Sequence, residues 1–245
     1  MGPMETPYRE IARDGVTYQV WDSVARVTHW IHAAAFGVLL YTGFAIGGFV
    51  SRSAVDEPVF GFSMATTRNL HYIAAVLLTV NGLFRIYWFA VARHYRTWFL
   101  HDIWRLDFWR EVVWKLKDYA SLRYIDHEAH TLGHNALASL AYLIAFLISA
   151  GLVLTGFAMK AQIDPGGALQ FWFGWVIAFC GSEANVRALH RFLMWPLIAF
   201  VIHHVAIVFY LDVLGEGGLV SSIVVGFKFK PKSWKPEEKP WLHKS

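Results

Sequence analysis

Four apolar stretches, each about as long as a bilayer core is thick, are the feature that most constrains this chain. A helix needs about 20 apolar residues to cross a hydrocarbon core roughly 30 Å thick, because no water is available there to satisfy backbone polar groups. The chain is therefore predicted to be a single all-α integral membrane domain, residues 1–245, built as a four-transmembrane-helix bundle. The expected helices cover approximately residues 27–49, 70–92, 135–158 and 190–214.

Composition agrees with a membrane location and narrows the available chemistry. The chain is 56% hydrophobic and only 16% charged, whereas a soluble protein has about 25% charged residues. It contains twelve histidines and a single cysteine, Cys180. One thiol excludes a Cys-ligated iron–sulfur cluster, an internal disulfide and a CxxCH haem attachment. Any metal held by this chain is expected to be held by imidazole.

Positive charge predicts the orientation of the helices. Sixteen Lys and Arg residues lie before the first helix, in the 93–133 connection and after residue 214, but only four lie in the other two loops. The excess of basic residues marks the cytoplasmic side, so both termini are expected there, with residues 215–245 as a basic cytoplasmic tail. The first twenty residues lack the pattern of a removable signal peptide. Because the basic residues flank membrane ends, they are expected to face lipid and not nucleic acid.

Two connections contain further apolar residues. In the 93–133 connection, Trp and Phe recur every three to five residues, which predicts an amphipathic interfacial helix between the second and third spans. In the 159–189 loop, the segment ALQFWFGWVIAFCG is too short to span a bilayer. It is expected to be re-entrant, interfacial or covered by a partner subunit.

An internal repeat divides the chain into two halves. The motif TGFA occurs at residues 42–45 and 155–158, and the motif RxLH follows at residues 68–71 and 187–190. The same order in both halves predicts one helical hairpin used twice. The two hairpins should pack as a four-helix bundle, with His71 and His190 at the same depth near the outer side. The glycine-containing TGFA motifs are read as the ends of their helices.

The fourth helix carries two histidines that should share a face. Fourteen residues separate His190 from His204, which corresponds to about 21 Å of rise and a rotation of only about 40°. His203 lies about 140° from His190 and should point elsewhere. A histidine inside a membrane helix is costly and is by default a functional candidate.

Each histidine of the fourth helix has a possible partner at its own depth. His71 matches His190 on the outer side, while His29 or His32 near the start of the first helix matches His204 on the inner side. Haem takes one axial ligand from each face, and helix bundles build cofactor sites from such facing side chains. The pattern therefore predicts two b-type haems stacked across the membrane.

Other interpretations of the histidines are open at this point. His127, His130 and His134 share a helical spacing that suits zinc or iron, but they lack the HExxH spacing of zincins. A membrane di-iron desaturase also combines four helices with many histidines, although its ligands cluster at one surface. In a purely structural subunit, the histidines would only pack.

The sequence resembles the membrane cytochrome b subunit of nickel–iron hydrogenases, which is related to formate dehydrogenase gamma and thiosulfate reductase cytochrome b subunits. The resemblance extends from about residue 20 to residue 230. Its motifs are ARVTHW at 25–30, TGF at 42–44, RIYW at 85–88, GHN at 133–135, LHR at 189–191 and HV at 204–205. The sequence departs from the family pattern at Ala75, Leu193, Pro196 and His203.

The resemblance implies a specific set of ligands and partners. It implies that His29, His71, His190 and His204 bind haem b iron, in the pairs His71/His190 outside and His29/His204 inside. It also implies an anchor subunit of the bacterial or archaeal cytoplasmic membrane that passes electrons from the small and large subunits of a periplasmic-side hydrogenase to quinone. Such a subunit does not itself activate hydrogen. A formate dehydrogenase or a thiosulfate or polysulfide reductase is the alternative donor complex.

Overall fold

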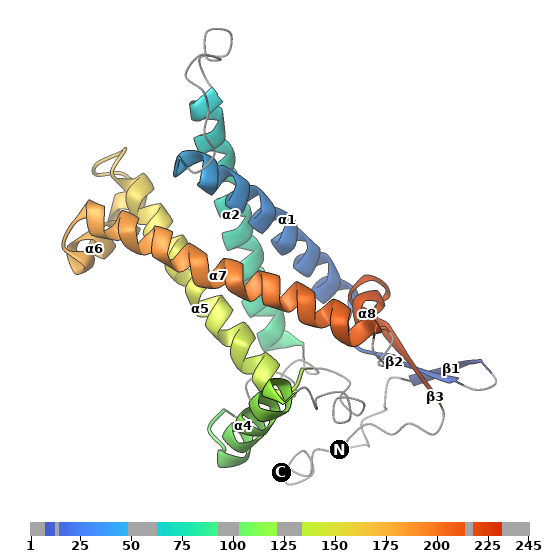
Figure 1. Cartoon of the computed structure of the whole chain (residues 1–245). Helices are drawn as coiled ribbons and strands as arrows, with labels where there is room; N and C mark the ends of the chain where they lie inside the picture. The colour runs from blue at the N-terminus through green and yellow to red at the C-terminus, as the bar shows by residue number, and fades with distance from the viewer. Residues whose placement is uncertain are drawn as a thin grey trace. The chain divides into compact units, whose positions relative to one another are not determined.

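The computed structural model describes residues 8–12, 15–48, 63–92, 103–121, 134–213 and 218–231. The chain forms two compact units (Figure 1). The first, residues Trp21–Arg93, is called the first hairpin. The second, called the second unit, combines Met1–Val20 with His94–Ser245. Each unit is described by itself.

The first hairpin pairs α1 (Ser23–Ile46) with α2 (Ser63–Val91) along their lengths (Figure 1). Asp22 fixes one end of the pair. One carboxylate oxygen of Asp22 accepts a 2.7 Å hydrogen bond from the Ala25 amide, which satisfies a free N–H of the first turn of α1. The other oxygen accepts a 2.9 Å bond from the Trp88 indole. The start of α1 is therefore tied to the end of α2.

A buried polar contact lies further inside the first hairpin. The Asn81 side chain of α2 donates a 2.9 Å hydrogen bond to the Thr28 carbonyl of α1, and both residues are buried. The other buried residues of this hairpin are mostly small, including Ala35, Ala45 and Ala74. Small residues let membrane helices approach closely, and polar groups between them satisfy one another.

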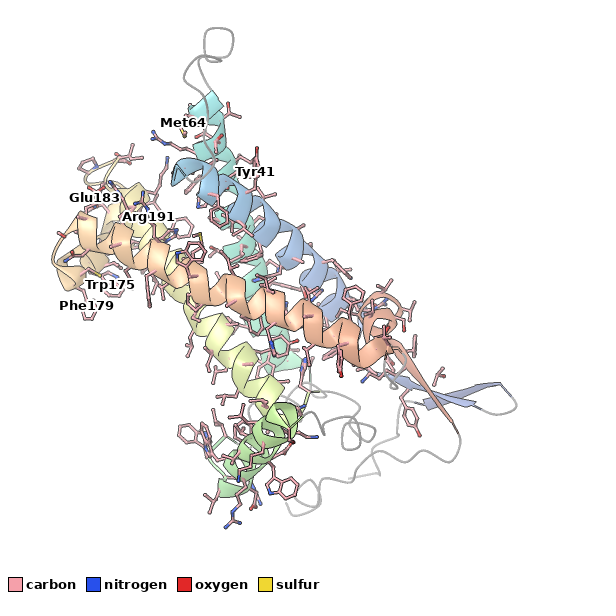
Figure 2. The ribbon with its side chains drawn as sticks, in the orientation of Figure 1. Tyr41, Met64, Trp175, Phe179, Glu183 and Arg191 are labelled. Carbon is pink, nitrogen blue, oxygen red and sulfur yellow. The ribbon has the colours of Figure 1, made fainter. Side chains whose placement is uncertain are left out.

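In the second unit, α5 and α7 form the equivalent helical pair, and α6 packs across one end of it (Figure 1). Their bounds are Ala136–Ala161 for α5, Ala168–Cys180 for α6 and Glu183–Leu211 for α7. The three helices meet in a buried cluster of Ala158, Val176 and Val186. On the outward side of α6, Trp175 and Phe179 project away from the helix (Figure 2) and are 55% and 84% exposed. The short apolar segment of the 159–189 loop is therefore a helix with an apolar outer surface.

The amphipathic helix expected between the second and third spans is confirmed as α4 (Leu106–Ala120). Its Phe108 and Val112 pack against the first turn of α5, and Glu111 accepts a 3.1 Å hydrogen bond from the Ala136 amide. A second, exposed apolar stripe runs along the same helix and comprises Leu106, Trp109, Val113 and Leu116. The helix thus has one apolar face on α5 and another facing outward.

A three-stranded antiparallel sheet, which the sequence interpretation did not include, joins the two ends of the chain. Strand β2 (Gly15–Gln19) lies between β1 (Tyr8–Ala12) and β3 (Phe227–Pro231). The short helix α8 (Leu219–Val225) precedes β3. The segment predicted only as a basic tail therefore begins with regular structure within its described part.

The four predicted membrane spans are confirmed, but their boundaries shift. Among the described residues, four helices are long and apolar enough to cross a membrane, and at most 17% of each apolar window is buried within the protein. Helices α2 and α7 begin at Ser63 and Glu183, about one to two turns before the apolar runs. The Ser182 hydroxyl caps α7 by accepting a bond from the Asn185 amide. Capping allows a helix to begin in polar sequence that a hydropathy pattern leaves outside the span.

Candidate functional site

In the first hairpin, the TGFA and RxLH motifs meet at one contact. The Thr42 hydroxyl of α1 lies 2.8 Å from Nδ1 of His71 on α2. The same hydroxyl donates to the Val38 carbonyl one turn earlier, at 2.7 Å. Gly43 lies beside the imidazole, and a Cβ at that position would come within 3.6 Å of the His71 ring. The threonine of TGFA therefore contacts the histidine of RxLH, and the glycine of TGFA leaves space for its ring.

The second unit repeats this arrangement. The Thr155 hydroxyl of α5 lies 2.8 Å from Nδ1 of His190 on α7 and donates to the Gly151 carbonyl at 2.7 Å. A Cβ on Gly156 would lie only 3.3 Å from the His190 ring. The sequence repeat therefore corresponds to a repeated side-chain contact. TGFA does end α1, which stops at Ile46, one residue after the motif. In α5 the expected helix end is too early, because that helix continues three residues beyond the motif to Ala161.

The threonine contact determines which ring nitrogen is available to a metal. A hydroxyl has one proton, and in both hairpins it is directed at a backbone carbonyl, so the oxygen accepts from the Nδ1–H of the histidine. Nε2 then carries the lone pair. Metal-binding histidines are usually fixed in this way by a hydrogen bond to the other ring nitrogen. His71 and His190 thus fit axial ligation of haem iron through Nε2.

His204 lies further along α7 and has a different partner. Its Nδ1 is 3.0 Å from the Tyr142 hydroxyl of α5, and its ring stacks on Phe200 with the two centroids 5.9 Å apart. His190 and His204 both contact α5, in agreement with the predicted shared face. His203 is exposed, which also agrees with the prediction.

The remaining inner candidates, His29 and His32, lie in the first turns of α1. The His29 ring contacts Trp30 edge-on, with the two centroids 5.2 Å apart. Nδ1 of His32 is buried and makes no hydrogen bond with any described residue. Because His29 and His204 belong to different units, their pairing stays a prediction, as does the pairing of His71 with His190.

The alternative metal cluster receives no support from the described residues. His127 and His130 lie outside them, and His134 packs its ring against Tyr142 with a centroid separation of 4.5 Å. Within the described ranges, no group of three or more His, Cys, Asp or Glu side chains is placed to hold a metal ion.

The structure bears on two departures from the family pattern. Pro196 lies inside α7, which continues unbroken from Glu183 to Leu211. Leu193 lies against Gly151, where a Cβ would come within 2.9 Å of a Leu193 methyl group. Gly151 on α5 thus leaves space for the Leu193 side chain on α7, where the family often has a glycine.

Sequence reasoning missed the partners of the histidines. Thr42 and Thr155 were seen only as part of a repeat, and Tyr142 was not singled out. A usable signal existed for Tyr142, because it precedes Thr155 by thirteen residues, as His29 precedes Thr42. The repeat register therefore places Tyr142 in the position of a candidate ligand.

Known proteins resemble this chain over most of its length. A protein named "Probable Ni/Fe-hydrogenase B-type cytochrome subunit" from Cupriavidus necator is 35% identical over 212 residues, covering 85% of this chain and 86% of the relative. A similarly named Escherichia coli K12 protein is 30% identical over 87% of this chain and 91% of its own length. An Azotobacter vinelandii relative is 30% identical over 90% and 92%. Residues 20–226 match the family model described as prokaryotic cytochrome b561, and the chain belongs to that family.

Proposed function

We propose that this chain is the haem b subunit that anchors a nickel–iron hydrogenase to the cytoplasmic membrane and passes its electrons to quinone. The observation that carries this proposal is the duplicated threonine–histidine contact, with 2.8 Å between the hydroxyl and Nδ1 in each hairpin. A histidine that only packs does not require the same fixed tautomer and the same adjacent glycine twice. The names of the relatives support a hydrogenase as the donor complex.

Four histidines provide the axial ligands in this proposal. His71 and His190 form the outer pair, and His29 and His204 form the inner pair, which gives two haems. Each hairpin then contributes one ligand at each depth. His29 is chosen over His32 through the resemblance of the ARVTHW motif.

Haem b held by two imidazoles would supply one-electron transfer, because the two ligands would leave the iron no open site. The residues of this chain provide binding, orientation and tuning. The Thr42 and Thr155 oxygens hold the ring planes and fix Nε2 as the ligand atom, while Gly43 and Gly156 leave space beside each imidazole. Hydrogen activation takes place in the large subunit, and the iron–sulfur small subunit delivers the electrons, consistent with the single cysteine of this chain.

The proposal includes an orientation with both termini in the cytoplasm and the outer histidines on the side of the hydrogenase. Two observations support this orientation. The excess of Lys and Arg lies in the terminal segments and in the 93–133 connection. Strand β2 also pairs directly with β3, which supports a location of these two strands on one side of the membrane, and the basic residues favour the cytoplasmic side.

Haem content tests the ligand assignment. We expect His190→Ala to lose one of two haems per chain, measured as pyridine haemochrome in complexes purified from membranes. His203→Ala is the matched control, because His203 lies on the same helix but is exposed. Normal haem content in His190→Ala would exclude the assignment.

Metal analysis of the purified complex tests the donor. Nickel that co-purifies in stoichiometric amount with this chain is expected, together with hydrogen-dependent reduction of the haem and of added quinone. Molybdenum or tungsten in place of nickel would instead identify a formate dehydrogenase or a sulfur-compound reductase.

A further inference from the structure

The two hairpins are equivalent at the outer histidine but have diverged at the inner one. Counting from the repeated motifs, Tyr142 stands in the second unit where His29 stands in the first hairpin, thirteen residues before the threonine. Arg85 stands where His204 stands, fourteen residues after the RxLH histidine. At this depth, the first hairpin has its histidine on the leading helix, whereas the second unit has it on the following helix.

Tyr142 contacts Nδ1 of His204, as Thr42 and Thr155 contact Nδ1 of the two outer histidines. Its hydroxyl lies 3.0 Å from Nδ1 of His204, the same nitrogen that threonine contacts in His71 and His190. Aromatic neighbours hold its ring on two sides. Phe200 meets it edge-on, with a centroid separation of 5.6 Å, and the His134 ring lies 4.5 Å away. The phenol therefore has a defined position from which to orient the imidazole.

We propose that Tyr142 is the positioning residue of His204 and that its phenol lowers the reduction potential of the inner haem less than the threonine hydroxyls lower that of the outer haem. This inference rests on the proposed function, because it takes His204 to be a haem ligand. Ligation through Nε2 places the proton on Nδ1, so the Tyr142 oxygen must accept it. The interaction thus has the same polarity as the threonine contacts but uses a different oxygen.

The identity of the accepting oxygen determines how much charge the imidazole donates to iron. A phenol oxygen shares its lone pairs with the ring and is a weak acceptor. The Thr155 oxygen is a stronger acceptor, because its own proton is engaged by the Gly151 carbonyl at 2.7 Å. A stronger acceptor gives histidine more imidazolate character, which favours ferric iron and lowers the potential. The outer haem should therefore have the lower reduction potential. Electron transfer from the outer haem to the inner haem should then be favourable.

Tyr142→Phe provides the test, because it removes the hydroxyl and keeps the ring packed against Phe200. The control is Tyr87→Phe on α2, which removes the hydroxyl of a 58% exposed tyrosine. Both variants are made in the full complex and titrated potentiometrically, with haem counted separately. We expect two haems in each variant, an upward shift of one midpoint potential in Tyr142→Phe, and no shift in Tyr87→Phe.

The outcomes separate this inference from the proposed function. An unchanged pair of midpoint potentials in Tyr142→Phe, or an equal shift in Tyr87→Phe, overturns the role of Tyr142. Loss of the inner haem alone supports positioning, whereas loss of both haems indicates a general structural role and overturns it. His204→Ala serves as the reference: if it keeps both haems, the ligand assignment itself is wrong. If it loses one haem while Tyr142→Phe changes nothing, only the present inference fails.

Discussion

Replacing Thr155 by valine tests whether the repeated hydroxyl holds the outer ligand. The substitution keeps the shape of the side chain but removes the oxygen that lies 2.8 Å from Nδ1 of His190. Haem ligation fixes a proton on that nitrogen, and without Thr155 the proton points at a methyl group. Leaving one such donor unsatisfied costs about 1–3 kcal/mol, which corresponds to roughly a 5- to 150-fold change in an equilibrium constant.

Loss of the Thr155 hydroxyl should also weaken the binding of the metal itself. Mutation of an outer-shell hydrogen-bond partner typically lowers metal affinity by about 10- to 100-fold. We therefore expect Thr155→Val to release the outer haem about tenfold faster or more, measured as transfer to excess apomyoglobin from the purified complex. The outer haem that is still bound should have a higher midpoint potential, because its ligand His190 has lost a hydrogen-bond acceptor.

Two comparisons make this experiment specific. Thr155→Ser keeps an oxygen in place and should retain haem at close to the wild-type rate. Thr79→Val on α2 removes a hydroxyl that also donates to a backbone carbonyl, that of Ala75 at 2.7 Å, but the described contacts of Thr79 include no histidine. If Thr155→Val and Thr79→Val release haem at the same rate and share the same midpoint potentials, the hydroxyl does not hold the ligand and the reasoning is refuted.

Three further changes test the packing around these sites. Gly156→Ala should alter the electron paramagnetic resonance g-values of the outer haem more than Gly43→Ala, since the added Cβ would lie 3.3 Å and 3.6 Å from the respective imidazoles; equal spectra would contradict this order. Asn81→Leu should lower the free energy of unfolding in detergent by about 1 kcal/mol, because it removes the buried hydrogen bond to the Thr28 carbonyl. Phe108→Ala should loosen α4 from α5 and expose α4 to proteolysis, at a cost of about 3 kcal/mol; unchanged cleavage would show that this contact does not hold α4.

The membrane helices could be predicted from sequence because hydropathy and length are local properties. Their ends could not, because Asp22 and Ser182 extend α1 and α7 into polar sequence through capping bonds that a hydropathy window does not include. The sheet was missed for a different reason. Strand β2 pairs with β3 across about two hundred residues of sequence, and such short strands carry little periodic signal.

The site residues that lie in repeated motifs could be predicted from the sequence, whereas those that differ between the two halves could not. His71 and His190 stand in repeated motifs, so the repeat itself drew attention to them. Tyr142 occurs once, in an apolar helix where aromatic side chains are common, and its direction depends on which face of α5 meets α7. Its spacing from Thr155 marks the register position of a ligand, but only the structure shows that it contacts His204.

The divergence of the two hairpins has a functional consequence in the proposed assignment. Two identical repeats would give each haem the same threonine–histidine hydrogen bonds and hence nearly the same ligand basicity. A bundle of that kind would carry electrons equally well in both directions. At the inner depth, His204 contacts the Tyr142 phenol and not a threonine hydroxyl, while the outer contacts stay matched at 2.8 Å. The asymmetry that makes inward transfer favourable would then lie at the inner depth, where Tyr142 stands at the register position of His29 and Arg85 at that of His204, while the outer contacts remain symmetrical.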